Sequence, residues 1–225
     1  MHKILKFQTA LVLLFISNIF GQEYFEGELQ YKIEYEPLNK NIPVSYLEKE
    51  MGKSFSAYVQ EDRYIMIYHA TGELGWMKIM VMLNEGYTYT EFENSDTITK
   101  VKFANEKDKL IEFKRNSDDK REILNEMCES ITINYQPTDS DSFFQIFRGK
   151  YYFNPKYKLN DKLYENYTDG FWNLYVNESK SISIRNETEF YPIFKTIQEV
   201  TSITEKEILD EMFELNKSKI IFEKE

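Results

Sequence analysis

The residue types most often used in catalysis are scarce in this sequence. Beyond residue 21 the only histidine is His69, and the whole chain has one cysteine, Cys128. No G-x-S-x-G motif supplies a nucleophile for His69, and the chain lacks the second histidine or cysteine pair that a zinc site requires. The neighbours of Cys128 are acidic and apolar, and such neighbours do not stabilise a thiolate. We therefore expect a surface histidine and a buried structural cysteine.

Carboxylates are abundant, but their spacing does not form a calcium loop. Asp118-Asp119 and Asp139-Ser140-Asp141 lack the central glycine and the terminal glutamate of an EF-hand loop, and we interpret them as solvated turns. The sequence also lacks the glycine-rich motifs that bind nucleotides. It therefore predicts no metal and no cofactor. An enzyme remains a minor alternative, whose carboxylates or tyrosines would converge only in the fold.

The first 21 residues have the order of a cleavable secretory signal peptide. Lys3 and Lys6 precede an apolar run over residues 10–16, and Gly21 is a suitable cleavage position. The apolar run is shorter than the roughly 20 residues that span a bilayer. We expect residues 22–225 to form a single β-rich domain that is periplasmic or secreted and has no stable membrane span. A retained anchor is the alternative.

Charge and composition restrict the classes of molecule that this protein could bind. The chain has 28 basic and 38 acidic residues and a net charge of −10, and Lys3 and Lys6 would leave with the signal peptide. Such a surface repels phosphate backbones, so we expect no nucleic-acid partner. One cysteine cannot form an intrachain disulfide, so packing must stabilise the domain. The 17 tyrosines and the 14 phenylalanines that lie beyond residue 21 are available for it and favour a sheet.

Alternation of apolar and polar residues predicts many strands. It is clearest from Phe25 to Tyr35, which predicts a strand with one buried and one solvated face. Similar composition between short turns predicts strands over 54–60, 63–69, 76–83, 87–92, 97–103, 110–114, 120–135, 171–176, 181–185 and 194–202. Strands joined by short turns pair as neighbours. We predict an α+β, mostly antiparallel β fold, as a curved meander sheet or unclosed β-barrel covered by a few short helices.

Four segments are candidates for those helices: 45–51, 142–148, 159–167 and 204–215. The first ends before Gly52, a residue type that commonly terminates helices. Thr204 and Glu207 have the spacing of a capping box, which favours a helix at 204–215. Strand remains the alternative for the later segments, because short apolar runs do not distinguish the two by period.

The order of these features resembles the LolA-like exported proteins of Bacteroidota. The resemblance rests on the alternating segment after the signal, Ile123-Leu124 with Cys128 in the middle of the chain, and Tyr191-Pro192 before a late strand. It implies an unclosed antiparallel barrel whose concave apolar side is covered by helices and carries lipoprotein acyl chains. This chain departs from that pattern because it lacks a long helical segment after its first strand.

Two functional hypotheses follow. The first is a non-enzymatic cell-envelope protein that binds a lipid or lipoprotein acyl chain inside the curved sheet. The expected lining is Leu29, Tyr31, Ile33, Phe55, Val59, Ile65 and Ile67, with a lid of Phe143, Phe144 and Phe147. Ordinary core packing is the alternative for each of these residues. The second hypothesis is a secreted interaction or scaffold domain without a ligand cavity, which would bind a protein partner.

Overall fold

In the part of the chain that the structure describes, twelve strands form one open sheet. The structure is a computed structural model and describes residues 24–103, 108–139 and 142–224; the predicted signal peptide, residues 1–21, lies outside them. The sheet runs from β12 at one edge to β7 at the other and is antiparallel except where β12 pairs with β6. The predicted fold class is therefore confirmed. Among the described residues, no helix has both the length and the apolar character needed to cross a membrane.

The elements follow one another in two runs of strands. The first run is β1 (Gly27–Pro37), α2 (Val44–Met51), β2 (Ser54–Val59), β3 (Arg63–Tyr68), β4 (Met77–Met82), β5 (Tyr87–Phe92) and β6 (Thr97–Lys102). The second is β7 (Lys109–Ile123), β8 (Glu126–Gln136), β9 (Ile146–Lys158), α3 (Trp172–Ser179), β10 (Ser181–Tyr191), β11 (Phe194–Glu205) and β12 (Ile220–Lys224). Three single 3₁₀ turns cover Asp161–Tyr164, Asp169–Phe171 and Asp210–Phe213.

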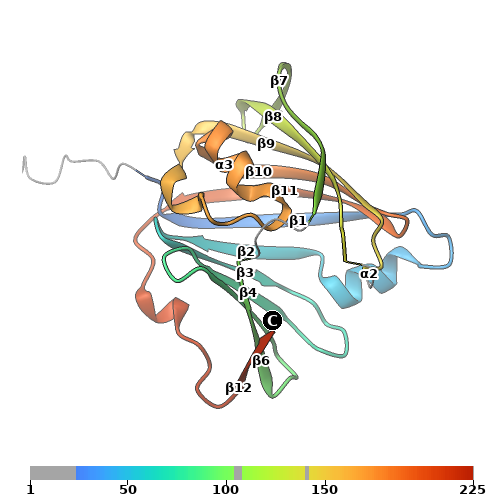
Figure 1. The fold of residues 1–225 in the computed structure, drawn as a ribbon, viewed down its shortest axis with the longest axis vertical. Helices are drawn as coiled ribbons and strands as arrows, with labels where there is room; N and C mark the ends of the chain where they lie inside the picture. The colour runs from blue at the N-terminus through green and yellow to red at the C-terminus, as the bar shows by residue number, and fades with distance from the viewer. Residues whose placement is uncertain (1–23, 104–107, 140–141, 225) are drawn as a thin grey trace, which may run out of the picture.

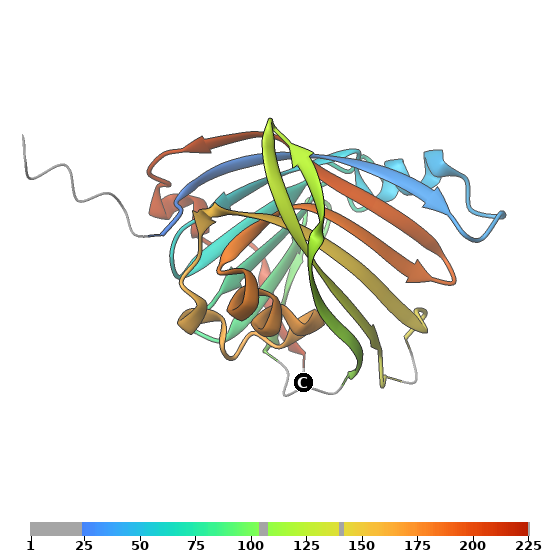
Figure 2. The same cartoon turned by 90° about the horizontal axis from the view of Figure 1, so that it is seen from above.

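Strand β1 joins the two halves of the sheet. It pairs with β2 on one side and with β11 on the other, so both runs of strands extend outward from it. The sheet bends at this strand so that its halves face each other, and α3 packs on β8 and β10 of the second half (Figures 1 and 2). The predicted alternation in β1 is confirmed. Leu29, Tyr31 and Ile33 are buried, whereas Lys32 and Glu34 are exposed.

The first half of the chain matches the sequence prediction closely. Strands β2 to β6 fall within the predicted ranges, and their register is a regular meander. Helix α2 is capped by Gly52, whose positive φ of 87° is a backbone conformation that glycine adopts without strain. The turns in this region can be predicted from the sequence because each strand pairs with the next strand along the chain.

The predicted helix at 142–148 is wrong. Ile146, Phe147 and Arg148 begin β9, and Phe147 lies opposite Phe190 of β10 in the ladder. Gly149, which the sequence suggests as a helix end, lies within the strand, where the ring of Tyr151 occupies the space that a side chain at position 149 would need. Strand pairing with β10 therefore outweighs the helical spacing of the phenylalanines.

The predicted helix at 204–215 is also wrong. Thr204 and Glu205 continue β11 and pair with Glu28 and Gly27 of β1. The Thr204–Glu207 capping box does not form because these ladder hydrogen bonds hold Thr204 in an extended conformation. Only the short 3₁₀ turn Asp210–Phe213 is helical in this segment.

The segment between β9 and β10 reverses two further predictions. The expected helix over 159–167 is a 3₁₀ turn at Asp161–Tyr164, and the expected strand over 171–176 is occupied by α3. Phe171, Tyr175 and Ser179 recur every four residues and are all buried, which is the helical spacing that the strand prediction missed.

The C-terminal segment covers the face of the sheet opposite α3. Ile208 and Phe213 pack with Ile65 into a second, smaller hydrophobic core. Lys219 forms a buried ion pair with Glu91, with 3.1 Å between Nζ and Oε1. This segment then ends in β12, a strand that the sequence pattern did not indicate.

Candidate functional site

A pocket of about 250 Å³ lies between the two halves of the sheet. Strands β1 to β3 supply one wall, β8 to β11 supply the other, and the segment that contains α3 lies at one end. The bend of the sheet therefore forms this pocket, and no single sequence motif supplies its lining. We call it the aromatic pocket, because more than half of its lining residues are aromatic, including Tyr31, Phe55, Tyr68, Tyr135, Phe147 and Tyr164.

Stacked rings line both walls of the aromatic pocket. On one wall the ring centroids of Tyr31 and Phe55 are 4.3 Å apart, and those of Phe55 and Tyr68 are 4.8 Å apart. On the other wall Tyr135 and Phe147 stack at 4.7 Å. Both groups of strands carry these rings at neighbouring cross-strand positions, where aromatic side chains come within contact distance.

The two ends of the pocket differ in burial. Tyr164, Tyr175 and Val176 are buried at the end where α3 packs, so this end is closed. Thr188 and Phe190, which line the pocket at the end of β10 farther from α3, are only partly buried. The pocket is therefore accessible to solvent on the side away from α3.

Hydrogen bonds tie the pocket's polar groups to its walls. The Tyr31 hydroxyl donates to the backbone oxygen of Ser183 at 2.7 Å, across the two halves of the sheet. The Tyr64 hydroxyl donates to that of Tyr167 at 3.2 Å. Because each bond joins elements distant in the sequence, these hydroxyls help to fix the separation of the walls.

The lining carries no formal charge. Among the described residues, none of the pocket's lining side chains is a lysine, arginine, histidine, aspartate or glutamate. Burial raises the pKa of Tyr68 and Tyr167 to about 12 and that of Tyr164 further, because an ionised phenol would lose its hydration. These hydroxyls are therefore neutral dipoles at any physiological pH.

Half of the residues predicted as lining do line the aromatic pocket. Leu29, Tyr31, Phe55, Val59 and Phe147 all contribute to its walls. Their role in binding stays a prediction. Their positions could be predicted from the sequence because each lies on the buried face of an alternating strand or in a stack of rings on neighbouring strands.

The other predicted lining residues lie elsewhere. The prediction put Ile65 and Ile67 on the wrong face, since both pack in the smaller core under the C-terminal segment. Ile33 is buried in the main core but does not reach the pocket. Phe143 is 86% exposed, and Phe144 packs against Phe147, Phe190 and Phe194, so the two do not form a helical lid.

Sequence reasoning missed the side of β3 that faces the pocket. Tyr64, Met66 and Tyr68 line it, although isoleucines at 65 and 67 are the more hydrophobic set. Both faces of β3 are covered, so hydrophobicity alone could not assign the inner face. The tyrosines at positions 64 and 68 could have indicated the inner face of β3, because aromatic residues also lie on the inner faces of β1 and β2.

His69 and Cys128 have the environments expected from the sequence. His69 is exposed, and its Nε2 lies 3.0 Å from the Ser56 hydroxyl, which itself donates to Gln30 Oε1 at 2.8 Å. The single hydroxyl proton is thus directed at Gln30, whereas a nucleophilic serine would direct it at the histidine. Cys128 is fully buried, and burial raises the pKa of its thiol to about 11, which disfavours the reactive thiolate. Within the described residues, no group of three or more histidine, cysteine or carboxylate side chains could hold a metal ion.

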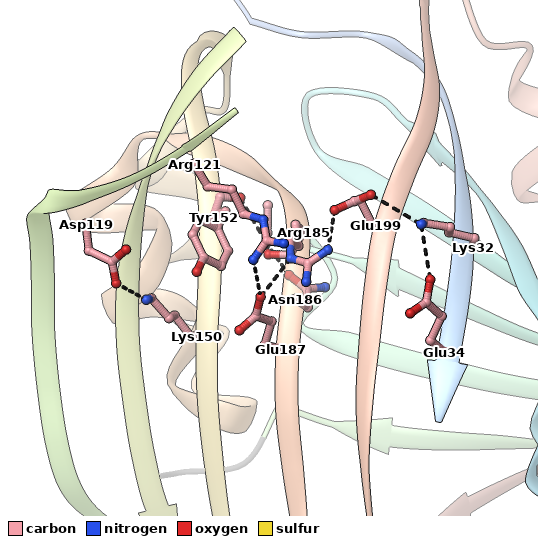
Figure 3. Close-up of polar contacts among 11 residues, drawn as sticks. Lys32, Glu34, Asp119, Arg121, Lys150, Tyr152, Arg185, Asn186, Glu187 and Glu199 are labelled. Carbon is pink, nitrogen blue, oxygen red and sulfur yellow. Dashed lines mark hydrogen bonds and ion pairs between the residues drawn. The ribbon is translucent and has the colours of Figure 1, made fainter. Parts of the chain in front are cut away.

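The face opposite the pocket carries an ion network across β1, β7, β10 and β11. Arg185 donates to Glu187 at 2.8 Å and also contacts Glu199, which is 3.4 Å from Lys32 (Figure 3). Arg121 of β7 reaches Glu187 at 3.1 Å. The alternation of strand side chains separates this network from the aromatic pocket, so we assign it to the stability of the bent sheet.

Comparison with known proteins gives no family. No protein-family model matches this chain, and no curated protein matches it. Among solved structures, a crystal structure of an uncharacterized conserved protein from Thermus thermophilus matches with a TM-score of 0.45 and 7% identity. The match covers 88% of this chain and 91% of that chain. We base no argument on this likeness.

Proposed function

We propose that this protein is an exported, non-enzymatic binding protein of the cell envelope that holds the apolar part of a lipid. A single acyl chain of a lipid or lipoprotein is the guest that its resemblance to LolA-like proteins implies. The observation that carries the proposal is the aromatic pocket of about 250 Å³ in the bend of the sheet. Export rests on the signal-like residues 1–21.

The driving force would be the transfer of hydrocarbon out of water. Burial of apolar surface contributes roughly 25 cal/mol per Å², or about 0.8 kcal/mol per methylene group. An apolar cavity of about 150 Å³ in another protein is enough to bind benzene. The aromatic pocket exceeds that volume, and its walls are held by hydrogen bonds, which limits the entropy lost on binding. It suits a small guest or the end of one chain.

Filling the pocket should abolish binding. Ala57 lines the pocket and is buried, so Ala57→Leu should place three more carbon atoms inside it. We expect at least a tenfold loss of affinity for 1-decanol by isothermal titration calorimetry. Ala70→Leu is the matched control, because Ala70 is buried but does not line the pocket. Equal binding by Ala57→Leu and the unaltered protein would place the guest elsewhere.

Native mass spectrometry of the protein purified from its own host tests the same proposal in a natural setting. We expect a bound molecule of lipid mass, and Ala57→Leu should lose it. A clean apo mass, together with no response to added 1-decanol, would contradict lipid binding.

An interaction domain is the second candidate, and the edge strand β12 favours it. Ile220, Ile221 and Phe222 are 70%, 50% and 59% exposed on this strand. Exposed apolar residues on a sheet edge are typical of strand addition by a partner. This alternative predicts that native mass spectrometry shows a second polypeptide and no small molecule, and that Phe222→Ser removes the polypeptide.

A further inference from the structure

The lining of the aromatic pocket differs from that of a simple hydrocarbon channel. Its aliphatic residues, such as Leu29, Val59 and Val176, are outnumbered by aromatic rings, and eight of those rings are tyrosines. A plain acyl chain requires only apolar walls, so this excess of hydroxyl-bearing rings calls for a guest that uses them.

We propose that the guest presents an uncharged, flat ring system that carries one or more oxygen substituents, and that this ring enters the aromatic pocket. The inference rests on the proposed binding function and specifies its ligand class. A lipid of this kind would place its ring between the two walls, and any aliphatic tail would extend toward the open side.

The stacked rings favour a flat guest. Tyr31, Phe55 and Tyr68 form a continuous stack on one wall, and Tyr135 and Phe147 form another on the opposite wall. A ring that enters between them either extends a stack or meets ring edges, and both are preferred aromatic geometries. A flexible chain gains none of this and loses more conformational freedom.

The absence of charge in the lining excludes an ionised guest group. A carboxylate inside the pocket would lose its hydration and meet no cation among the described lining residues. The tyrosines could donate hydrogen bonds to it, but they cannot neutralise it. A neutral oxygen has a much smaller desolvation cost, which one hydrogen bond can offset.

One lining hydroxyl at the closed end is suited to such an oxygen. Within the described residues, the buried hydroxyl of Tyr175 has no hydrogen-bond partner. The nearby hydroxyl of Ser179 donates to the Ser181 backbone oxygen, and that of Ser183 donates to Asn186 Oδ1. An unpaired buried hydroxyl is destabilising, so a carbonyl or hydroxyl oxygen of the guest would recover that energy on binding.

Four probes separate charge from shape. Isothermal titration calorimetry at pH 7 would compare 2-naphthol with naphthalene-2-carboxylate, and 1-decanol with decanoate. We expect 2-naphthol to bind at least tenfold more tightly than the naphthoate and more tightly than 1-decanol. Binding of 1-decanol alone, or naphthoate binding as tight as naphthol binding, would overturn the inference and leave the proposed function intact. Binding of none of the four would overturn both.

A substitution at the closed end tests the hydrogen bond. Tyr175→Phe should weaken 2-naphthol binding about threefold to tenfold, the value of one neutral hydrogen bond, and leave naphthalene binding unchanged. Tyr164→Phe, at another lining tyrosine, is the second variant, and Tyr46→Phe, at an exposed position in α2, is the control. A purely structural effect would weaken both probes equally and contradict the assignment.

Discussion

The free energy of unfolding is expected to fall steeply once the pH rises above 10, because buried tyrosines line the aromatic pocket. Burial raises the pKa of Tyr68 and Tyr167 from 10 to about 12. Between these values the unfolded chain has released the phenolic protons and the folded chain still holds them. Stability from these groups is complete below pH 10 and is lost as the pH rises through 12.

The size of this effect follows from the number of buried phenols. Each loses about 1.4 kcal/mol of stability per pH unit within its window, so Tyr68 and Tyr167 together cost roughly 3 kcal/mol at pH 11. Tyr31, Tyr135 and Tyr164 add to the slope, since burial raises their pKa values further. Urea unfolding at a series of pH values measures the slope.

One substitution provides the control for the alkaline effect. Tyr167→Phe removes a titrating group and should flatten the slope, whereas Tyr46→Phe, at an exposed position, should not. Phenol ionisation followed by near-ultraviolet absorbance should then coincide with unfolding. Phenols that all titrate near pH 10 while the protein stays folded would show that the pocket is freely hydrated.

The second large effect is expected from Arg185→Met. The Arg185 side chain is 7% exposed and pairs with Glu187 and Glu199. Burial alone would raise the pKa of Glu199, but the hydrogen bond and charge of Arg185 hold it below its ordinary value. Without Arg185, Glu187 and Glu199 lose the cation that they share and keep only Arg121 and Lys32 as partners. We expect a loss of about 2–3 kcal/mol, below the value for fully buried pairs because both carboxylates keep some hydration.

Two further variants isolate the cause of that loss. Arg148→Met removes an exposed arginine from its pair with Glu189 and should change stability by less than about 1 kcal/mol. Adding Glu199→Gln to Arg185→Met should restore part of the stability, because it removes one of the two carboxylates that have lost Arg185. If the double variant were less stable than the single one, lost packing of the arginine stem would be the main cause.

The strands of the first half are predictable because their stabilising contacts are local. Turns such as Glu61-Asp62 join strands that pair with each other, so composition and alternation carry enough information. The elements of the second half are not predictable in the same way. Phe147 and Thr204 belong to strands because of partners in β10 and β1, and such pairings leave no signature in the segment itself.

Half of the predicted lining residues are correct, and the reason is related. Alternation in β1 correctly indicates Leu29 and Tyr31, because the other face of that strand is charged. In β3 both faces are apolar, since the C-terminal segment covers the outer one, and no pattern in the chain indicates that cover. The prediction therefore assigned Ile65 and Ile67 to the wrong face of β3 and missed Tyr64 and Tyr68, which line the pocket.

The most direct test of the account is a methyl NMR titration with 2-naphthol and 1-decanol. Saturable shifts are expected at Leu29, Val59 and Val176, which line the aromatic pocket. Ile65 and Ile67, which lie on the opposite face of the sheet, should stay unchanged. Shifts confined to the two isoleucines, or no saturable shift at any of the five residues, would contradict a guest in the bend of the sheet.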